Sequence, residues 1–274
     1  MNNNVVYDKN SNEFLNADDK QLGVANLMWH IIGKCNLFCD FCFSPKSKNE
    51  FDISKLELYM EIFKELGVKK IDISGGEPLL YNNLHKICIS LKENDIPFTI
   101  TTSGFVESDK LSWLLKNHNL FTRIILSING PNASIHESIN HGIGSFNQVC
   151  DLAYKLMKLN ARLRINTVCT EKICSMESAK KFVELINGIS PLEWCLIQDF
   201  NADERNTKNY DEFLRKISNQ SLSSNIKLIT RSKKIYRDYC VLDENGFLYL
   251  RGKENNRMLL ESTDIKNFLE GNYQ

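Results

Sequence analysis

The stretch Lys34–Phe43, KCNLFCDFCF, follows a short apolar run, Leu27–Ile32, that is typical of a β-strand. It places Cys35, Cys39 and Cys42 within eight residues at C-x3-C-x2-C spacing. A structural zinc ion needs four ligands, and the stretch offers neither a His nor a fourth Cys. Three thiolates can instead hold three irons of a [4Fe-4S] cluster and leave one iron open for a ligand.

Strands and helices alternate along the chain on both sides of this loop. Apolar runs predict six strands, at residues 27–32, 70–74, 97–102, 122–128, 162–168 and 192–198. Helical spacing predicts the intervening helices, at residues 53–66, 84–94, 108–115, 146–158 and 177–186. This alternation predicts an α/β fold with a parallel sheet, either an open doubly wound sheet or a complete or partial barrel. In each case we expect the site at the carboxyl ends of the strands.

The character of the sequence changes after residue 200. A polar loop leads to a predicted helix near residues 212–217, a strand at 226–230 and a hairpin that turns at residues 244–246. We therefore divide the chain into three predicted parts. These are a polar N-terminal arm (1–24), a βα core (25–200) and a small C-terminal α+β cap (201–274).

The amino-acid composition limits the cellular compartment and the classes of partner that we expect. Lys plus Arg and Asp plus Glu number 34 each, so no global charge attracts nucleic acid or an anionic membrane. The polar first twenty residues do not resemble a signal peptide, and no apolar run approaches the ~20 residues that span a bilayer. Nine cysteines at irregular spacings favour a reducing compartment. We therefore expect a cytoplasmic protein.

The cysteine stretch and the later SGGEP at residues 74–78 together resemble the radical S-adenosylmethionine (SAM) superfamily, over roughly residues 27–198. The resemblance implies a partial (βα)6 TIM-like barrel and SAM bound to the open iron of a [4Fe-4S] cluster. One electron, from an external donor of the flavodoxin or ferredoxin type, would cleave SAM to a 5′-deoxyadenosyl radical. That radical would abstract a hydrogen atom from the substrate.

The resemblance also implies roles for individual residues. Cys35, Cys39 and Cys42 match the cluster ligands. The residues that match the SAM site at the aromatic position and in the GGEP motif are Phe41, Gly75, Gly76, Glu77 and Pro78. The glycines would let the backbone approach the methionyl end of SAM, and Glu77 would help bind its ammonium group. Polar contacts to the SAM carboxylate or ribose are expected from Ser103, Ser127, Asn129 and Asn166. The alternative for these four is a turn or strand-end residue that satisfies its own backbone.

Six further cysteines are scattered along the chain at positions 88, 150, 169, 174, 195 and 240. They lack the spacing of a second ligand set, so we expect one cluster and interpret these six as small buried apolar residues. The five histidines show no metal-binding spacing either.

The C-terminal third resembles the viperin group, in LEWCLIQDF (192–200) and KKIYRDYCVLDENGFLYL (233–250). That resemblance implies removal of water from a ribonucleoside triphosphate such as CTP, which gives a 3′-deoxy-3′,4′-didehydro nucleotide used in antiviral defence. Cations suit phosphate oxygens. Lys70 matches a lysine beside the SAM site of that group, and Arg231 begins a basic run that continues with Lys233, Lys234 and Arg237. The alternative for that run is a solvated charged surface.

Other features favour a different substrate. Viperin has a lysine where this chain has Cys195 and an asparagine where it has Met28. Residues 127–146, with their Gly-Ser-Phe ending, resemble enzymes that modify ribosomally made peptides. A peptide or another small molecule is therefore the second hypothesis. An iron–sulfur redox sensor is a remote third, since GGEP has no purpose in an electron carrier and no DNA-reading motif is present.

Overall fold

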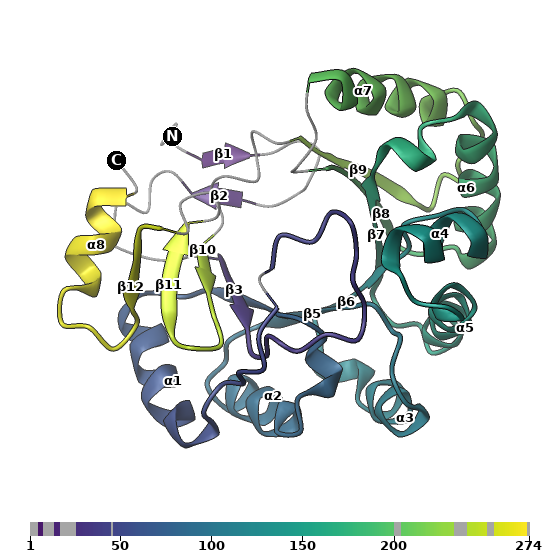
Figure 1. Ribbon diagram of the computed structural model, residues 1–274. Coiled ribbons are helices and arrows are strands. Elements are labelled where there is room, and N and C mark those ends of the chain that lie inside the picture. The colour runs from purple at the N-terminus through teal and green to yellow at the C-terminus, as the bar shows by residue number, and fades with distance from the viewer. Residues whose placement is uncertain are drawn as a thin grey trace.

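A computed structural model describes residues 5–7, 14–16, 26–44, 46–199, 204–232, 240–250 and 255–272. One large sheet organises these residues, and its ten strands lie in the order β12-β11-β10-β3-β4-β5-β6-β7-β8-β9 (Figure 1). Helices cover the outer face of the curved sheet, and the loop that follows β3 lies within its curve (Figure 1). An open, curved parallel sheet with helices outside is a partial TIM-like barrel, as predicted.

The six predicted strands are confirmed, with ends that differ from the prediction by at most two residues. They are β3 (Asn26–His30), β4 (Lys70–Ser74), β5 (Phe98–Thr102), β6 (Arg123–Ser127), β7 (Leu163–Cys169) and β8 (Glu193–Gln198). Each pairs in parallel with the next in chain order. Their carboxyl ends therefore share one edge of the sheet, and the loop that carries the three cysteines starts at that edge.

The helices between these strands carry an apolar side that packs on the sheet. They are α1 (Leu56–Glu65), α2 (Leu84–Glu93), α3 (Ser108–Lys116), α5 (Ser145–Lys158) and α6 (Met176–Ile189), and α7 (Glu204–Ser218) follows β8. Single turns of 3-10 helix occur at η1 (Ile53–Lys55), η2 (Pro78–Leu80), η3 (His118–Leu120) and η4 (Glu171–Ile173). Phe63 of α1 shows the packing, because its ring meets that of buried Trp29 edge-on at 5.3 Å between centroids.

Two helices were not predicted, α4 (Ala133–Asn140) and α8 (Ile265–Asn272). The side chain of Asn132 caps α4 by accepting a hydrogen bond of 3.0 Å from the backbone N–H of Ile135. The helix ends at His141, whose φ of 54° is left-handed. The segment 127–146 therefore contains a capped helix and the turn into α5.

The chain after residue 200 extends the same sheet at both edges. The strand β9 (Lys227–Arg231) pairs in parallel with β8, and β10 (Cys240–Leu242) pairs in parallel with β3. The predicted hairpin is confirmed: β10 pairs antiparallel with β11 (Phe247–Leu250), and β12 (Arg257–Leu259) follows. Gly246 makes the turn with a φ of 88°, which favours glycine.

Near the N-terminus, β1 (Val5–Tyr7) and β2 (Phe14–Asn16) form an antiparallel pair. The rest of the predicted arm, 1–24, lies outside the described residues. Within the described part of the chain, no helix has the length and apolar character that crossing a membrane requires. The proposed boundaries at residues 24 and 200 stay predictions.

Candidate functional site

The cysteine loop, residues 31–51, leaves the carboxyl end of β3 and returns to its own starting point. The backbone N–H of Gly33 donates to the Asn49 carbonyl over 2.9 Å, and that of Phe51 donates to the Ile31 carbonyl over 2.9 Å. The Tyr81 hydroxyl donates to the Phe51 carbonyl over 2.8 Å. Both ends of the loop are therefore fixed to the edge of the sheet.

The tip of the loop rests on the end of α4. The backbone N–H groups of Phe38 and Asp40 donate to the carbonyls of Asn140 and Ile139, each over 3.1 Å. These carbonyls belong to the last turn of the helix, where carbonyl groups lack a partner within the helix. The Asp40 carboxylate also lies 2.6 Å from His141 Nε2, within hydrogen-bond distance, and this adds a side-chain contact to the two backbone ones.

The three thiols differ in their exposure. Cys35 and Cys39 are half-buried and Cys42 is exposed. Burial raises the pKa of the Cys39 thiol to about 12, and the negative charges of Cys42 and Cys35 raise it further. Burial also raises the pKa of Cys35, while a hydrogen bond from the Leu37 backbone N–H opposes this rise. Burial therefore disfavours the thiolates of Cys35 and Cys39, and a bound metal would supply the positive charge that favours them.

The number and kind of these ligands fit the predicted cluster. No group of three or more His, Cys, Asp or Glu side chains in the described residues is arranged to hold a metal ion. A cubane cluster takes one thiolate at each of three irons, so its ligands stand farther apart than the ligands of one ion. Of the other cysteines, Cys174 is half-buried, and those at positions 88, 150, 169, 195 and 240 are buried as predicted.

The Gly75-Gly76 turn packs directly on the start of the cysteine loop. A Cβ atom at Gly75 would lie 2.3 Å from the Ile32 carbonyl oxygen, and one at Gly76 would lie 2.1 Å from that of Lys34. Real Cβ contacts are not this short, so both positions require glycine as the backbone stands. The Gly76 N–H donates to the Ile32 carbonyl over 2.6 Å. The glycines thus join β4 to the loop, whether or not they also approach SAM.

Glu77 is buried and joins β4 to β5. Its carboxylate accepts hydrogen bonds from the hydroxyl of Thr102, from the hydroxyl and backbone N–H of Ser103, and from the Leu79 N–H. Burial raises the pKa of Glu77, and these hydrogen bonds oppose the rise. Pro78 follows as the first residue of η2. Glu77 and Ser103 are therefore hydrogen-bonded to each other, and their predicted contacts to SAM stay predictions.

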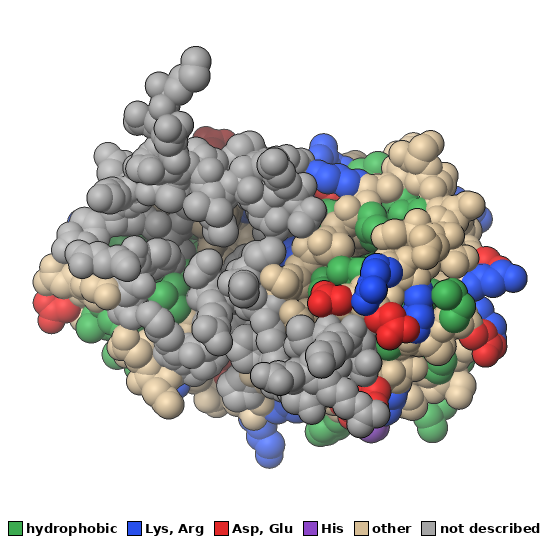
Figure 2. All heavy atoms as spheres, turned by 90° about the horizontal axis from the view of Figure 1, so that it is seen from above, with side chains coloured by type: hydrophobic (Ala, Val, Ile, Leu, Met, Phe, Trp, Pro, Cys, Tyr) green, Lys and Arg blue, Asp and Glu red, His purple; other side chains and the backbone are tan. Residues whose placement is uncertain are grey.

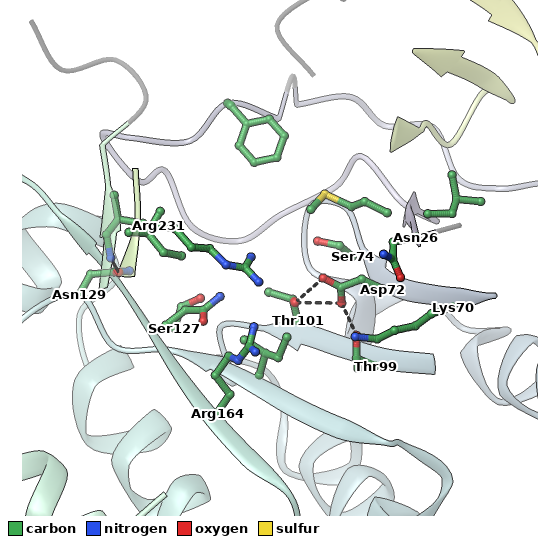
Figure 3. Close-up of a pocket in the computed structure, with 17 residues that line it drawn as sticks. Asn26, Lys70, Asp72, Ser74, Thr99, Thr101, Ser127, Asn129, Arg164 and Arg231 are labelled. Carbon is green, nitrogen blue, oxygen red and sulfur yellow. Dashed lines mark hydrogen bonds between the residues drawn. The ribbon is translucent and has the colours of Figure 1, made fainter. Parts of the chain in front are cut away.

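A central cavity lies inside the curved sheet, and charged side chains line it (Figure 3). Lys70 and Asp72 project from β4, Arg164 from β7 and Arg231 from β9. Arg164 and Arg231 reach into the cavity in Figure 3, although they are only 1% and 7% exposed. The Arg164 Nε lies 2.7 Å from the Glu193 carboxylate, which also binds the Arg123 Nε at 3.2 Å.

Three of the predicted SAM contacts line the same cavity: Ser127, Asn129 and Asn166. The side-chain amide of Asn129 already has hydrogen-bond partners, because its Oδ1 accepts from the Val168 N–H and its Nδ2 donates to the Asn140 Oδ1. The Asn166 Oδ1 is buried and accepts no hydrogen bond from the described residues. A ligand donor fits there, since an unpaired buried acceptor costs free energy. Phe41, the predicted adenine neighbour, is half-buried against the core.

The predicted basic residues divide into those that the structure describes and those that lie outside the described residues. Lys70 stands at the amino end of β4, five positions before Gly75, so the two lie about 16 Å apart along the strand. It is therefore at the opposite end of β4 from the GGEP turn. Lys233, Lys234 and Arg237 fall outside the described residues.

Sequence reasoning missed Asp72 and Arg164. Asp72 accepts hydrogen bonds from the hydroxyls of Thr99, at 2.9 Å, and Thr101, at 3.1 Å, so polar groups of β4 and β5 meet inside the sheet (Figure 3). The available signal was a charged residue at alternate positions of an otherwise apolar strand, as in KIDIS. Such a residue must face either solvent or a polar cavity, and the enclosing helices exclude solvent.

The outer surface offers no comparable concentration of charge in the view of Figure 2. Blue and red side chains alternate there on the side of α6 and α7, next to the grey residues. This mixture agrees with the equal numbers of acidic and basic residues in the sequence. On that visible face, an anionic ligand finds no single-sign patch such as the cations of the central cavity provide.

Comparison with known proteins identifies relatives of several kinds. The family model described as Radical SAM superfamily matches residues 29–183, more than half of the chain. The S-adenosylmethionine-dependent nucleotide dehydratase of Thermoplasmatales archaeon (strain ISO4-H5) is 27% identical over 199 residues, which cover 68% of this chain and 70% of that protein. The GTP 3′,8-cyclase of Aquifex aeolicus (strain VF5) is 29% identical over 144 residues, 49% of this chain and 44% of that enzyme.

A solved structure supports the fold. The crystal structure of Streptococcus suis SuiB bound to S-adenosylmethionine superposes with a TM-score of 0.71 and 17% identity, and the match covers 90% of this chain and 66% of SuiB. At that identity the likeness concerns the fold alone. The chain spans less than half of the cyclase and just under two thirds of SuiB.

Proposed function

The chain belongs to the Radical SAM superfamily, and from this we propose that it cleaves SAM at a [4Fe-4S] cluster in order to dehydrate a ribonucleoside triphosphate. Members of the superfamily use these two cofactors, which supply the one-electron chemistry of the reaction. The product would be a 3′-deoxy-3′,4′-didehydro nucleotide. A role of this protein in antiviral defence would follow from that product.

In this proposal the chain's own residues prepare the cofactor edge of the sheet. Cys35, Cys39 and Cys42 would hold three irons, and the open iron would take the amino and carboxylate groups of SAM. The Gly75-Gly76 turn fixes the position of the loop against β4. The Asn166 Oδ1 is a suitable acceptor for a ribose hydroxyl of SAM, because it is buried and takes no hydrogen bond from the described residues.

The observation that carries the choice of substrate is the set of cations in the central cavity. Lys70, Arg164 and Arg231 come from three different strands and line one enclosed space. Enclosure makes charge-assisted hydrogen bonds to phosphate stronger than they are in water. Asp72 is the acidic side chain that lines the cavity among the described residues, and two threonine hydroxyls already bind it. Glu193 pairs with Arg164 from outside the lining, and the three cations that line the cavity outnumber its acidic side chain, which favours an anionic group.

The distance along β4 supports an elongated substrate. Lys70 and Arg164 lie toward the amino ends of β4 and β7, whereas Arg231 ends β9 at the carboxyl edge, where the cysteine loop also lies. A nucleoside triphosphate can place its phosphates near Lys70 and Arg164 and its ribose nearer to the cofactors. The two relatives named above act on nucleotides by name, and the dehydratase match covers about two thirds of both chains.

The test is a reaction of the anaerobically reconstituted, dithionite-reduced protein with SAM and each of the four common ribonucleoside triphosphates. We expect one of them to stimulate release of 5′-deoxyadenosine and to yield a product lighter by one water. Cleavage of SAM without stimulation by any of the four would retain the radical SAM chemistry and reject the nucleotide. A peptide substrate would then be tested next. Binding of a cluster without binding or cleavage of SAM would reject the whole proposal.

A further inference from the structure

The connections that lead into the amino ends of the parallel strands are rich in cations. Those before β4 to β9 span residues 66–70, 94–98, 117–123, 159–163, 190–193 and 219–227, each counted through the first residue of its strand. Their basic residues are Lys69, Lys70, Arg123, Arg162 and Lys227, and their acidic residues are Asp95 and Glu193. Positive charge is therefore in excess at this end of the sheet, although the whole chain is neutral.

A groove opens among these cations at the amino ends of the strands. Its volume is about 460 Å³, within the range of about 300–1,000 Å³ that is ordinary for small-molecule sites. The described residues that line it are Lys70, Pro97, Thr122, Arg123 and Arg162, and no acidic side chain is among them. Because β4, β5, β6 and β7 are paired in order, the sheet fixes the spacing of the backbones that carry these residues.

The nearby carboxylates do not balance the cations. The Glu193 carboxylate lies 3.2 Å from the Arg123 Nε and 2.7 Å from the Arg164 Nε, so one negative charge faces two guanidinium groups. Asp72 accepts hydrogen bonds from two threonine hydroxyls inside the sheet, and Asp95 is exposed in the turn after α2. An anionic ligand is therefore complementary to the groove.

The groove and the central cavity share charged side chains. Lys70 lines both spaces (Figure 3). Arg123 lines the groove, Arg164 lines the cavity, and the two are joined through Glu193. An anion in the groove attracts Lys70 and Arg123, which leaves Glu193 to neutralise Arg164 alone. Both effects reduce the positive charge that the cavity offers to an anion of its own.

We propose that this groove is a second anion site, which binds a small polyphosphate and thereby lowers the affinity of the central cavity for its nucleotide. Arg123 and Arg162 supply guanidinium groups suited to phosphate oxygens, and Lys70 supplies a third charge. The binding of polyphosphate is independent of the proposed function, whereas its effect on the nucleotide rests on that function. The coupling is reciprocal, so bound nucleotide weakens polyphosphate binding by the same factor.

Thr122 provides the sharpest test of binding, because it is exposed at the wall of the groove. Its hydroxyl donates to the Phe98 carbonyl over 2.8 Å. Thr122→Glu and Thr122→Gln both lose that bond and add side chains of similar size, so they differ mainly in charge. We would titrate the reconstituted holoenzyme with inorganic triphosphate by calorimetry at about 0.15 M ionic strength, where exposed charges are largely screened.

We expect Thr122→Glu to raise the dissociation constant of triphosphate about tenfold or more relative to Thr122→Gln, because its carboxylate repels the anion. Arg162→Gln should also weaken binding, whereas Arg215→Gln, at an exposed position of α7, should bind like wild type. Equal affinities of Thr122→Glu and Thr122→Gln would overturn the inference, since triphosphate would then bind elsewhere. Absence of binding to the wild-type holoenzyme would overturn it as well.

The coupling is measured by the KM for the stimulating nucleotide, with and without triphosphate. Triphosphate should raise this KM about fivefold or more in Thr122→Gln and leave it nearly unchanged in Thr122→Glu. An equal rise in both variants would mean direct competition inside the central cavity and would overturn the coupling. If no nucleotide stimulates SAM cleavage, the proposed function fails, while the titration with triphosphate still decides whether the groove binds an anion.

Discussion

The cysteine loop and the central cavity are built by different means. Backbone hydrogen bonds fix the loop to β3, to the Gly75-Gly76 turn and to the end of α4, and the glycines of that turn allow the close approach. In the cavity, side chains such as Lys70 and Arg164 project from separate strands, and each depends on its own residue type. The difference suggests that the loop serves chemistry common to a family, while the cavity decides the substrate.

We expect the largest effect from a substitution that removes a predicted cluster ligand. Cys39→Ala should abolish both the cluster absorption of the reconstituted protein and its cleavage of SAM, because two thiolates leave a second iron without a protein ligand. Visible absorption and release of 5′-deoxyadenosine measure these two properties. Cys88→Ser is the control, since Cys88 is buried in α2 away from the loop and should leave both intact. A normal cluster in Cys39→Ala would refute the assignment.

The loop was easy to predict because its signal is contiguous. Cys35, Cys39 and Cys42 occupy one short stretch, and the residue pattern of GGEP follows on the next strand. The six strands were predictable for a similar reason, since buried parallel strands are apolar throughout. The support for the loop was not predictable, because α4 contacts it from a hundred residues farther along the chain.

The cavity was harder to predict for a physical reason. Its lining residues occupy alternate positions on separate strands. Asp72 and Arg164 therefore line the same cavity only once the sheet curves. Lys70 matches a lysine beside the SAM site of the viperin group and stands at the opposite end of β4 from the GGEP turn, and its predicted contact with the substrate stays a prediction. The C-terminal segment was predicted as a cap, and β9 and β10 also extend the sheet, since strand pairing over that distance leaves no local signal.

The second-largest expected effect tests whether the close contact between the Gly75-Gly76 turn and the cysteine loop fixes the position of that loop. Gly76→Ala would place a Cβ 2.1 Å from the Lys34 carbonyl, so either the turn or the loop must shift. We expect a loss of about 3 kcal/mol or more in unfolding free energy, together with loss of SAM binding. Gly188→Ala is the control, because its Cβ would meet only the Tyr154 hydroxyl at 3.3 Å. Chemical denaturation and SAM titration measure both, and a Gly76→Ala protein with wild-type SAM affinity would contradict the role of the turn.

A smaller effect is expected in the cavity, and it should be selective. Arg164→Gln removes one charged donor while Glu193 keeps its contact with Arg123. Losing one charge-assisted hydrogen bond costs about 1.5–3 kcal/mol, so the KM for the stimulating nucleotide should rise about 10- to 100-fold. SAM affinity should stay unchanged. Arg162→Gln removes the same charge from an exposed position and should change neither value. If SAM affinity fell as much as nucleotide affinity, the division between loop and cavity would be wrong.

The smallest effect concerns His136, which packs behind the loop in α4. Its Nδ1 accepts a hydrogen bond of 3.1 Å from the Asn129 N–H, and the Asn140 side-chain amide lies 2.9 Å from its Nε2. Burial lowers the pKa of His136 to about 4, below the ordinary 6.5, because the site does not solvate a charged ring. A protonated Nδ1 would also face the Asn129 N–H with no acceptor between them.

The sign of the pH dependence follows from that lowered pKa. The unfolded protein takes up the proton first, so the stabilising effect of neutral His136 is complete above pH 6.5 and is lost as the pH falls toward 4. The slope is at most about 1.4 kcal/mol per pH unit in this range. His136→Gln should flatten the slope between pH 6.5 and 4, as measured by urea denaturation at each pH, while exposed His85→Gln should retain it. A wild-type slope in His136→Gln would mean that α4 does not depend on a neutral ring, and that the loop rests on its backbone contacts alone.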